Sequence, residues 1–190
     1  MCIRDCHNLA VILLLIIPLV TMRSFAEEKK SKTFALLLSS PIHLREIIVG
    51  KFLACMIVMG LMILLSAYST GYLILVGHPE IGPILTGYLG ILLMAGCYVS
   101  MGLFASSLTD NQIIAAVISF GLALFMWIIG WGAQAAGSGL GQLMEYLSLI
   151  THLEHFLKGL ISSSDLVYYL SFILFGLFLT HRVLESSRWR

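Results

Sequence analysis

The run FLACMIVMGLMILLSAYSTGYLILV, residues 52–76, contains no charged side chain. A helix needs about 20 predominantly apolar residues to cross a bilayer, and this run exceeds that length. Residues 84–105 and 113–133 are also uncharged, and a fourth run reaches span length if it covers residues 166–184 with its last polar side chains directed to the interface. These runs predict an all-α integral membrane protein, a polytopic helix bundle.

The composition supports the same class. Hydrophobic residues make up 59% of the 190 residues and charged residues only 11%, unlike a soluble domain. The formal net charge of +1 points to no nucleic-acid partner. The four cysteines follow neither a metal-ligand nor a disulfide-framework spacing. We therefore expect one membrane domain over residues 1–190, with no cofactor of its own.

Residues 9–22 form a fifth, shorter apolar run. A secretory signal peptide would fit its length, but the residues that follow, MRSFAEEKK, contain no small-residue cleavage site. We interpret the run as a membrane span.

The positive charges predict an orientation. If residues 23–51 are cytoplasmic, nine of the 11 Lys and Arg residues lie inside, and only Arg4 and Lys158 lie outside. The positive-inside rule favours this arrangement. Five spans with a cytoplasmic C-terminus place the N-terminus outside. We therefore expect five spans of six, with an earlier span absent from this sequence.

Much of the charge is concentrated in TMRSFAEEKKSKTFALLLSSPIHLREIIVGKF, residues 21–52. Glu28 precedes Lys32 by four positions, a spacing that stabilises helices, and the pattern predicts an amphipathic helix over about 24–38. Pro41 ends that helix and suits the first position of another, which continues into the next span. The alternative is a solvated loop whose cations only follow the topology.

This segment resembles the cytoplasmic segment of ABC-2-type transporter permeases. Two further stretches are similar to the same family: GYLGILLMAGCYVSMGLFASSLTDNQIIAAVISF at 87–120 and YLSLITHLEHFLKGLISSSDLVYYLSFILFGLFLTHRVLESSRW at 146–189. They look like the gliding-motility-associated branch. In this family the permease has six spans, and the segment between the second and third spans contacts the ATP-binding subunit and transmits its movement.

The resemblance implies that residues 23–51 form a cytoplasmic coupling segment with a coupling helix. The matching residues are Arg23, Glu27, Glu28, Thr33, Leu37, Ser40 and Pro41. The resemblance also implies two permease chains, identical or different, and two ATP-binding subunits in the bacterial cytoplasmic (inner) membrane. The sequence departs from the family at Lys32, where the family usually has Gly, and in the missing first span.

The chain contains no GxxxxGK[ST] phosphate-binding loop, so we expect ATP to be hydrolysed by a partner and not by this chain. The three central runs contain no Asp, Glu or His, which proton-driven carriers place inside their spans. We therefore expect a non-enzymatic permease subunit of an exporter. The alternatives are a membrane scaffold of a surface motility or secretion assembly and, less favoured, a channel.

Residues 134–165 are expected outside. Polar residues recur every three positions over 140–161, which indicates a re-entrant or interfacial amphipathic helix. Family resemblance points to an exit-side gate with His152, Glu154 and His155, and membrane anchoring without gating is the alternative. The two histidines have no third strong donor nearby, so we predict no metal site.

Small residues four positions apart indicate close helix packing. Such pairs occur at Gly96 with Ser100 and at Ala115 with Ser119. We expect these contacts within the chain, and a contact between two permease chains is the alternative.

Overall fold

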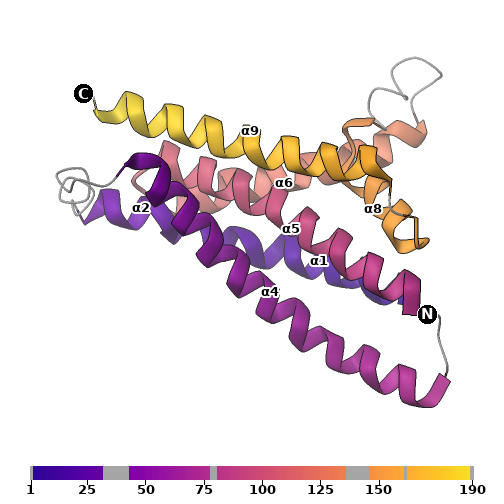
Figure 1. The fold of residues 1–190 in the computed structure, drawn as a ribbon. Coiled ribbons are helices and arrows are strands. Elements are labelled where there is room, and N and C mark those ends of the chain that lie inside the picture. Colours follow the sequence, from indigo (N-terminus) through magenta and orange to yellow (C-terminus); the bar gives the residue numbers. More distant parts are fainter. Residues whose placement is uncertain (1, 32–42, 78–80, 136–145, 161, 189–190) are drawn as a thin grey trace.

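The computed structural model describes residues 2–31, 43–77, 81–135, 146–160 and 162–188. All the regular elements in these ranges are helices, which confirms the all-α prediction. In chain order they are α1 (Cys2–Thr21), α2 (Arg23–Lys30), α4 (Leu44–Gly77), α5 (Ile81–Leu108), α6 (Gln112–Ala135), α8 (Leu149–Leu157) and α9 (Ser163–Arg188), as shown in Figure 1.

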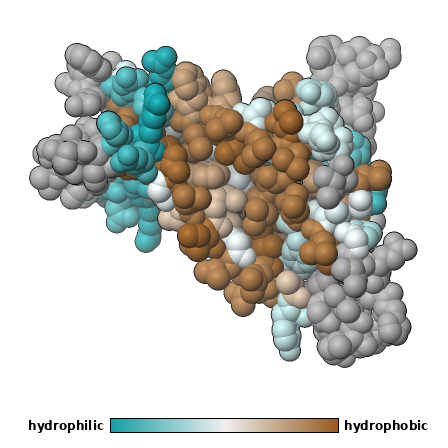
Figure 2. Space-filling model, viewed as in Figure 1, coloured by the Kyte–Doolittle hydropathy of each residue, from teal (hydrophilic) through white to brown (hydrophobic). Residues whose placement is uncertain are grey.

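Five stretches of the described helices are long and apolar enough to cross a membrane, as predicted. They are Asn8–Lys30, Leu44–Tyr68, Gly82–Leu108, Gln112–Gly130 and Ser163–Ser186. Figure 2 shows a hydrophobic band across the middle of the molecule, with hydrophilic side chains gathered at the end that holds α2 and the start of α4. We call this the α2 end and the opposite one, which holds α8 and the start of α9, the α8 end (Figure 1).

Helix α4 begins at Leu44, earlier than the span predicted to start at residue 52, and continues for 34 residues to Gly77. At 1.5 Å per residue it is about 50 Å long, whereas the hydrocarbon core is only about 30 Å thick. Its first turns, which carry Arg45 and Lys51, therefore extend beyond the apolar band at the α2 end. The predicted continuation of the second cytoplasmic helix into a span is confirmed from Leu44 onward, and the corner at Pro41 lies outside the described residues.

Helix α5 is the centre of the bundle. It packs against α1, α4, α6, α8 and α9. Of its most apolar window 78% is buried, against 22% for each of the spans in α4, α6 and α9. The outer faces of those three helices carry exposed leucine, isoleucine and phenylalanine side chains. These faces suit contact with lipid, where exposed apolar side chains cost no free energy of hydration.

Small residues bring α5 and α9 close together. A Cβ atom added at Gly96 would lie 2.9 Å from Cδ1 of Ile173, and one added at Gly176 would lie 2.6 Å from Oγ of Ser100. Such close approach supplies the packing that holds helices together where lipid replaces water. The pair Gly96 and Ser100 is therefore used within the chain, as we expected.

The described part of the segment at 140–161 covers residues 146–160 and contains the short helix α8. Within the described residues α8 begins after Ser148, whose side chain caps its first turn, and ends at Leu157. Gly159 follows with φ of +80°, a left-handed conformation that terminates the helix. Two members of the predicted polar face, Ser148 and His152, are buried, because one caps the helix and the other is directed toward α9.

Candidate functional site

Helix α2 is amphipathic and lies against the bundle. Phe25 and Ala26 are completely buried on its inner side. Arg23, Glu27 and Lys30 are exposed on its outer side. The buried face of this short helix packs against the bundle, and its charged face forms a polar surface at the α2 end.

Ser106, near the end of α5, holds the beginning of α2. Its Oγ accepts hydrogen bonds from the backbone N–H groups of Phe25, at 3.0 Å, and Ala26, at 3.1 Å, and donates one to the carbonyl of Met22, at 3.0 Å. The first N–H groups of a helix have no partner within the helix and usually bond to the N-cap side chain. Met22, at the N-cap of α2, makes no such bond. Ser106 of α5 therefore caps α2 in place of an N-cap side chain of its own.

Lys51, in the first turns of α4, ties α4 to α2. Its Nζ lies 2.6 Å from Oε1 of Glu28 and also donates to the carbonyl of Ser24. The same ammonium lies 4.7 Å from the centre of the Phe25 ring, within the range of a cation–π contact. The Lys51 and Glu28 side chains are only 21% and 28% exposed, so this ion pair is better shielded than a fully exposed one.

The seven predicted coupling residues therefore differ in their setting. Arg23 and Glu27 point outward, where a partner can reach them, whereas Glu28 pairs with Lys51 inside the chain. The remaining four lie outside the described residues: Thr33, Leu37, Ser40 and Pro41. The expected pairing partner of Glu28, Lys32, lies there too.

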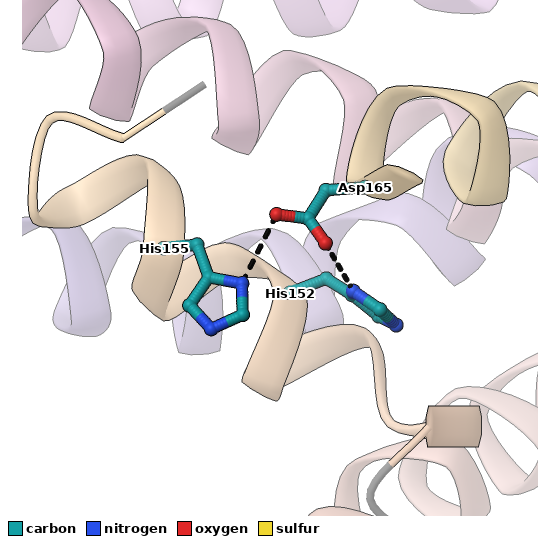
Figure 3. Close-up of side chains that lie close together, drawn as sticks. All are labelled: His152, His155 and Asp165. Atoms are coloured by element: carbon teal, nitrogen blue, oxygen red, sulfur yellow. Dashed lines mark hydrogen bonds and ion pairs between the residues drawn. The ribbon is translucent and has the colours of Figure 1, made fainter. Parts of the chain in front are cut away.

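A second polar site lies at the α8 end, where α8 meets the first turn of α9. His152 Nδ1 lies 2.7 Å from Oδ1 of Asp165, and His155 Nδ1 lies 3.0 Å from Oδ2 of the same carboxylate (Figure 3). The histidines are three positions apart on α8 and so share one face. Asp165 is 2% exposed and sits in the first turn of α9, where the helix dipole favours a negative charge.

The imidazole of His152 is fixed on several sides. Its Nε2 lies 3.0 Å from the carbonyl oxygen of Tyr146. Its ring stacks on Tyr168 with centroids 4.3 Å apart and an interplanar angle of 28°. His155 has no such enclosure, because 47% of its side chain is exposed. The cluster therefore has one rigid and one accessible histidine.

Helix α8 is seated against α5 and α6 as well as α9. A Cβ added at Gly90 of α5 would lie 2.8 Å from Cβ of Phe156, and one added at Gly130 of α6 would lie 2.6 Å from Oγ of Ser148. Thr86 donates a hydrogen bond to the carbonyl of Phe156 at 2.7 Å. Two glycines in different spans thus provide the space that α8 occupies.

Of the three predicted gate residues, the structure brings His152 and His155 together and leaves Glu154 apart. Glu154 is exposed and lies 3.8 Å from Lys158, one turn along α8. The prediction that no third strong metal ligand lies near His152 and His155 was wrong, because Asp165 contacts both histidines. A carboxylate at the start of an apolar span, with no Lys or Arg beside it in the sequence, is the signal that could have identified it.

Comparison with known proteins agrees with this architecture. No curated protein matches the chain. A family model described as ABC-2 family transporter protein matches residues 4–179, which include α8 and most of every predicted span. Because the match covers most of the chain, the protein belongs to the ABC-2 family of transporter proteins, as a membrane-spanning permease subunit.

Proposed function

We propose that this permease is driven by a separate ATP-binding subunit, and that α2 passes the movement of that subunit to the spans. The observation that carries the proposal is the joint at the α2 end. The outer face of α2 presents Arg23 and Glu27, while its inner face is bonded to two membrane helices. A partner that pushes on α2 therefore acts on those helices directly.

The hydrogen bonds and the ion pair of α2 define the path along which its movement would be transmitted. One connection runs to α4 through Glu28 and Lys51. The other runs to α5 through Ser106 and through Lys29, whose Nζ lies 2.5 Å from the carbonyl oxygen of Ser107. Since α5 contacts most of the other helices, a displacement of its end is carried into the whole bundle.

The distribution of charge supports a cytoplasmic α2 end, where ATP is available. Arg23, Lys29, Lys30, Lys51 and Arg182 belong to this end, whereas Lys158 lies at the α8 end. The positive-inside rule then places α8 outside. In this orientation α8, with His152, Glu154 and His155, would form an exit-side gate of an exporter. The bacterial inner membrane, a second permease chain and a role in gliding motility are hypotheses that rest on sequence resemblance.

The test is co-purification. The chain, expressed in its native host, is purified in detergent, and any nucleotide-binding protein that co-purifies with it is detected by ATP photolabelling. We expect Glu27→Lys to reduce the amount of ATP-binding protein recovered, because it reverses an exposed charge on the outer face of α2, where we propose that this protein binds. Glu154→Lys makes the same charge change on an exposed residue at the opposite end, and we expect it to leave recovery unchanged.

Glu28→Lys tests the transmission step separately. It places a like charge beside Lys51 and removes the ion pair between α2 and α4, while the outer face of α2 keeps its side chains. We expect the ATP-binding protein to remain bound, but its ATPase rate to lose the dependence on the permease. If no ATP-binding protein is recovered with the unmodified chain, the proposal fails, and a membrane scaffold in a surface motility or secretion assembly becomes the better account.

A further inference from the structure

We infer that His152, His155 and Asp165 form a binding site for a divalent transition-metal ion of the Zn²⁺ type, which joins α8 to the start of α9. The three offered ligand atoms all lie within 4.8 Å of one another. They come from two consecutive elements, the short helix α8 and the first turn of the last span, α9. The inference needs only this geometry and does not depend on coupling to an ATPase.

The hydrogen bonds of His152 call for a cation at this place. The carbonyl of Tyr146 can only accept, so the Nε2 atom that faces it must carry hydrogen. In a neutral imidazole the Nδ1 atom then presents a lone pair, and it faces Oδ1 of Asp165 at 2.7 Å. Two lone pairs at that distance repel unless a proton lies between them, on the ring or on the carboxyl group, or a metal ion binds both atoms.

The metal ion accounts for more of the arrangement than the proton does. Histidine ligands usually donate their other ring N–H to a carboxylate or backbone carbonyl, and the contact from Nε2 of His152 to Tyr146 has that form. A second imidazole, that of His155, converges on the same carboxylate with its own Nδ1. A proton on His152 requires no second imidazole, whereas a metal site does.

The donor set indicates the class of ion. Two imidazole nitrogens and one carboxylate oxygen suit Zn²⁺ and related first-row ions, whereas Mg²⁺ and Ca²⁺ prefer oxygen ligands alone. With three protein ligands, a tetrahedral ion keeps a fourth position for water. The half-exposed side of His155 gives that position access to solvent.

The buried carboxylate also needs a compensating charge. Asp165 is 2% exposed, and among the described residues its ion-pair contacts are with the two histidines and not with a Lys or Arg. An uncompensated buried carboxylate is costly, and the dipole of α9 offsets only part of that cost. A divalent ion shared with two neutral imidazoles would neutralise it.

Binding requires the ligand atoms to rearrange. With metal–ligand bonds of 2.0–2.2 Å and tetrahedral angles, the ligand atoms would lie about 3.3 Å apart. If Oδ1 of Asp165 is the carboxylate ligand, its 2.7 Å separation from Nδ1 of His152 must widen by roughly 0.6 Å, and the other ligand pairs, which now lie within 4.8 Å, must come to the same separation. His155 can move most easily, because its ring is exposed while His152 is stacked on Tyr168.

The experiment is a calorimetric titration of the full chain with Zn²⁺. The protein is reconstituted in lipid nanodiscs, carries no polyhistidine tag and is first stripped with a chelator. We expect one ion per chain from this site, with affinity reduced by about 10- to 100-fold or more in His155→Gln and Asp165→Asn, because removing even the outer partners of metal ligands costs that much. Glu154→Gln, a change at the adjacent exposed carboxylate, is the matched control and should bind as the parent does.

A second readout separates loss of the site from loss of the fold. The side chain at position 155 is half exposed and glutamine can still donate a hydrogen bond to Asp165, so the metal-free His155→Gln protein should unfold close to the temperature of the metal-free parent. Zn²⁺ should raise the unfolding temperature of the parent and of Glu154→Gln, and not that of His155→Gln. If Zn²⁺ does not bind, or binds His155→Gln and Asp165→Asn as tightly as the parent, the inference is overturned. The cluster is then a hydrogen-bonded contact between α8 and α9 that holds a proton and no metal ion.

Discussion

Replacing Ser106 by alanine tests whether the bundle itself organises the start of α2. The Ser106 hydroxyl makes three hydrogen bonds to the backbone around the start of α2, to Phe25, Ala26 and Met22. Alanine removes all three and leaves two N–H groups and one carbonyl without that partner in a buried place. The rest of α5 is unchanged, because the side chains are close in size.

The expected loss follows from the number of bonds. Hydrogen bonds between side chains in membrane proteins contribute about 0.6 kcal/mol each on average. Loss of a helix N-cap costs about 0.5–2 kcal/mol. Three bonds that together act as a cap should therefore contribute about 2 kcal/mol to the free energy of unfolding, which corresponds to a roughly 30-fold change in the folded-to-unfolded ratio.

Ser107 provides the matched control. It is the next residue, it is equally buried, and its Oγ donates to the carbonyl of Phe104 within α5 itself at 2.7 Å. Ser107→Ala should therefore change the free energy of unfolding by no more than about 0.5 kcal/mol. The measurement is equilibrium unfolding in mixed micelles, followed by circular dichroism. Equal losses for the two variants would refute the view that Ser106 caps α2.

Two further pairs of substitutions test the packing. Gly90→Ala places a Cβ 2.8 Å from Phe156 and should lower the free energy of unfolding by about 1–3 kcal/mol. Gly60→Ala, in a span helix with nothing within 4 Å of the new Cβ, should raise it by up to about 1 kcal/mol. A lower stability for Gly60→Ala than for Gly90→Ala would contradict the close packing of α8 against Gly90. Tyr98→Phe should leave stability unchanged or raise it, since its buried hydroxyl has no hydrogen-bond partner among the described residues. Tyr169→Phe should lower it by about 1 kcal/mol, because its hydroxyl donates to a backbone carbonyl of α8 at 2.7 Å; equal effects in both tyrosines would argue against this assignment.

The spans could be predicted because their signal is local. An apolar run of about 20 residues must form its hydrogen bonds within itself when it lies in lipid, so length and hydropathy are sufficient to predict a helix. The positions of these runs agree with the five candidate spans to within several residues at most ends. The span in α4 was expected to start at residue 52, whereas the candidate span starts at Leu44, because charged residues such as Arg45 and Glu46 outside the hydrocarbon do not interrupt a helix. The helix itself was predicted to begin at Pro41 and is described from Leu44 onward.

The helical character of the segment after the first span was also readable, since acidic and basic residues three and four positions apart stabilise one another locally. The partner of Glu28 was not readable in this way. Its carboxylate lies 2.6 Å from Lys51, which is 23 residues away and belongs to another helix. A contact of this kind depends on how α2 packs against α4, and spacing along one helix carries no information about it.

The same contrast between local sequence signals and tertiary contacts applies to the cluster of His152, His155 and Asp165 at the α8 end. The sequence by itself determined that His152 and His155 share a face of one helix, because three residues make nearly one turn. Only the tertiary structure decided that Asp165 completes the cluster, since the chain must reverse after Gly159 before the first turn of α9 can meet α8. Local hydrogen bonding and hydropathy fix which segments are helices, whereas the contacts within the two candidate sites arise where those helices pack, and packing depends on side chains from different helices.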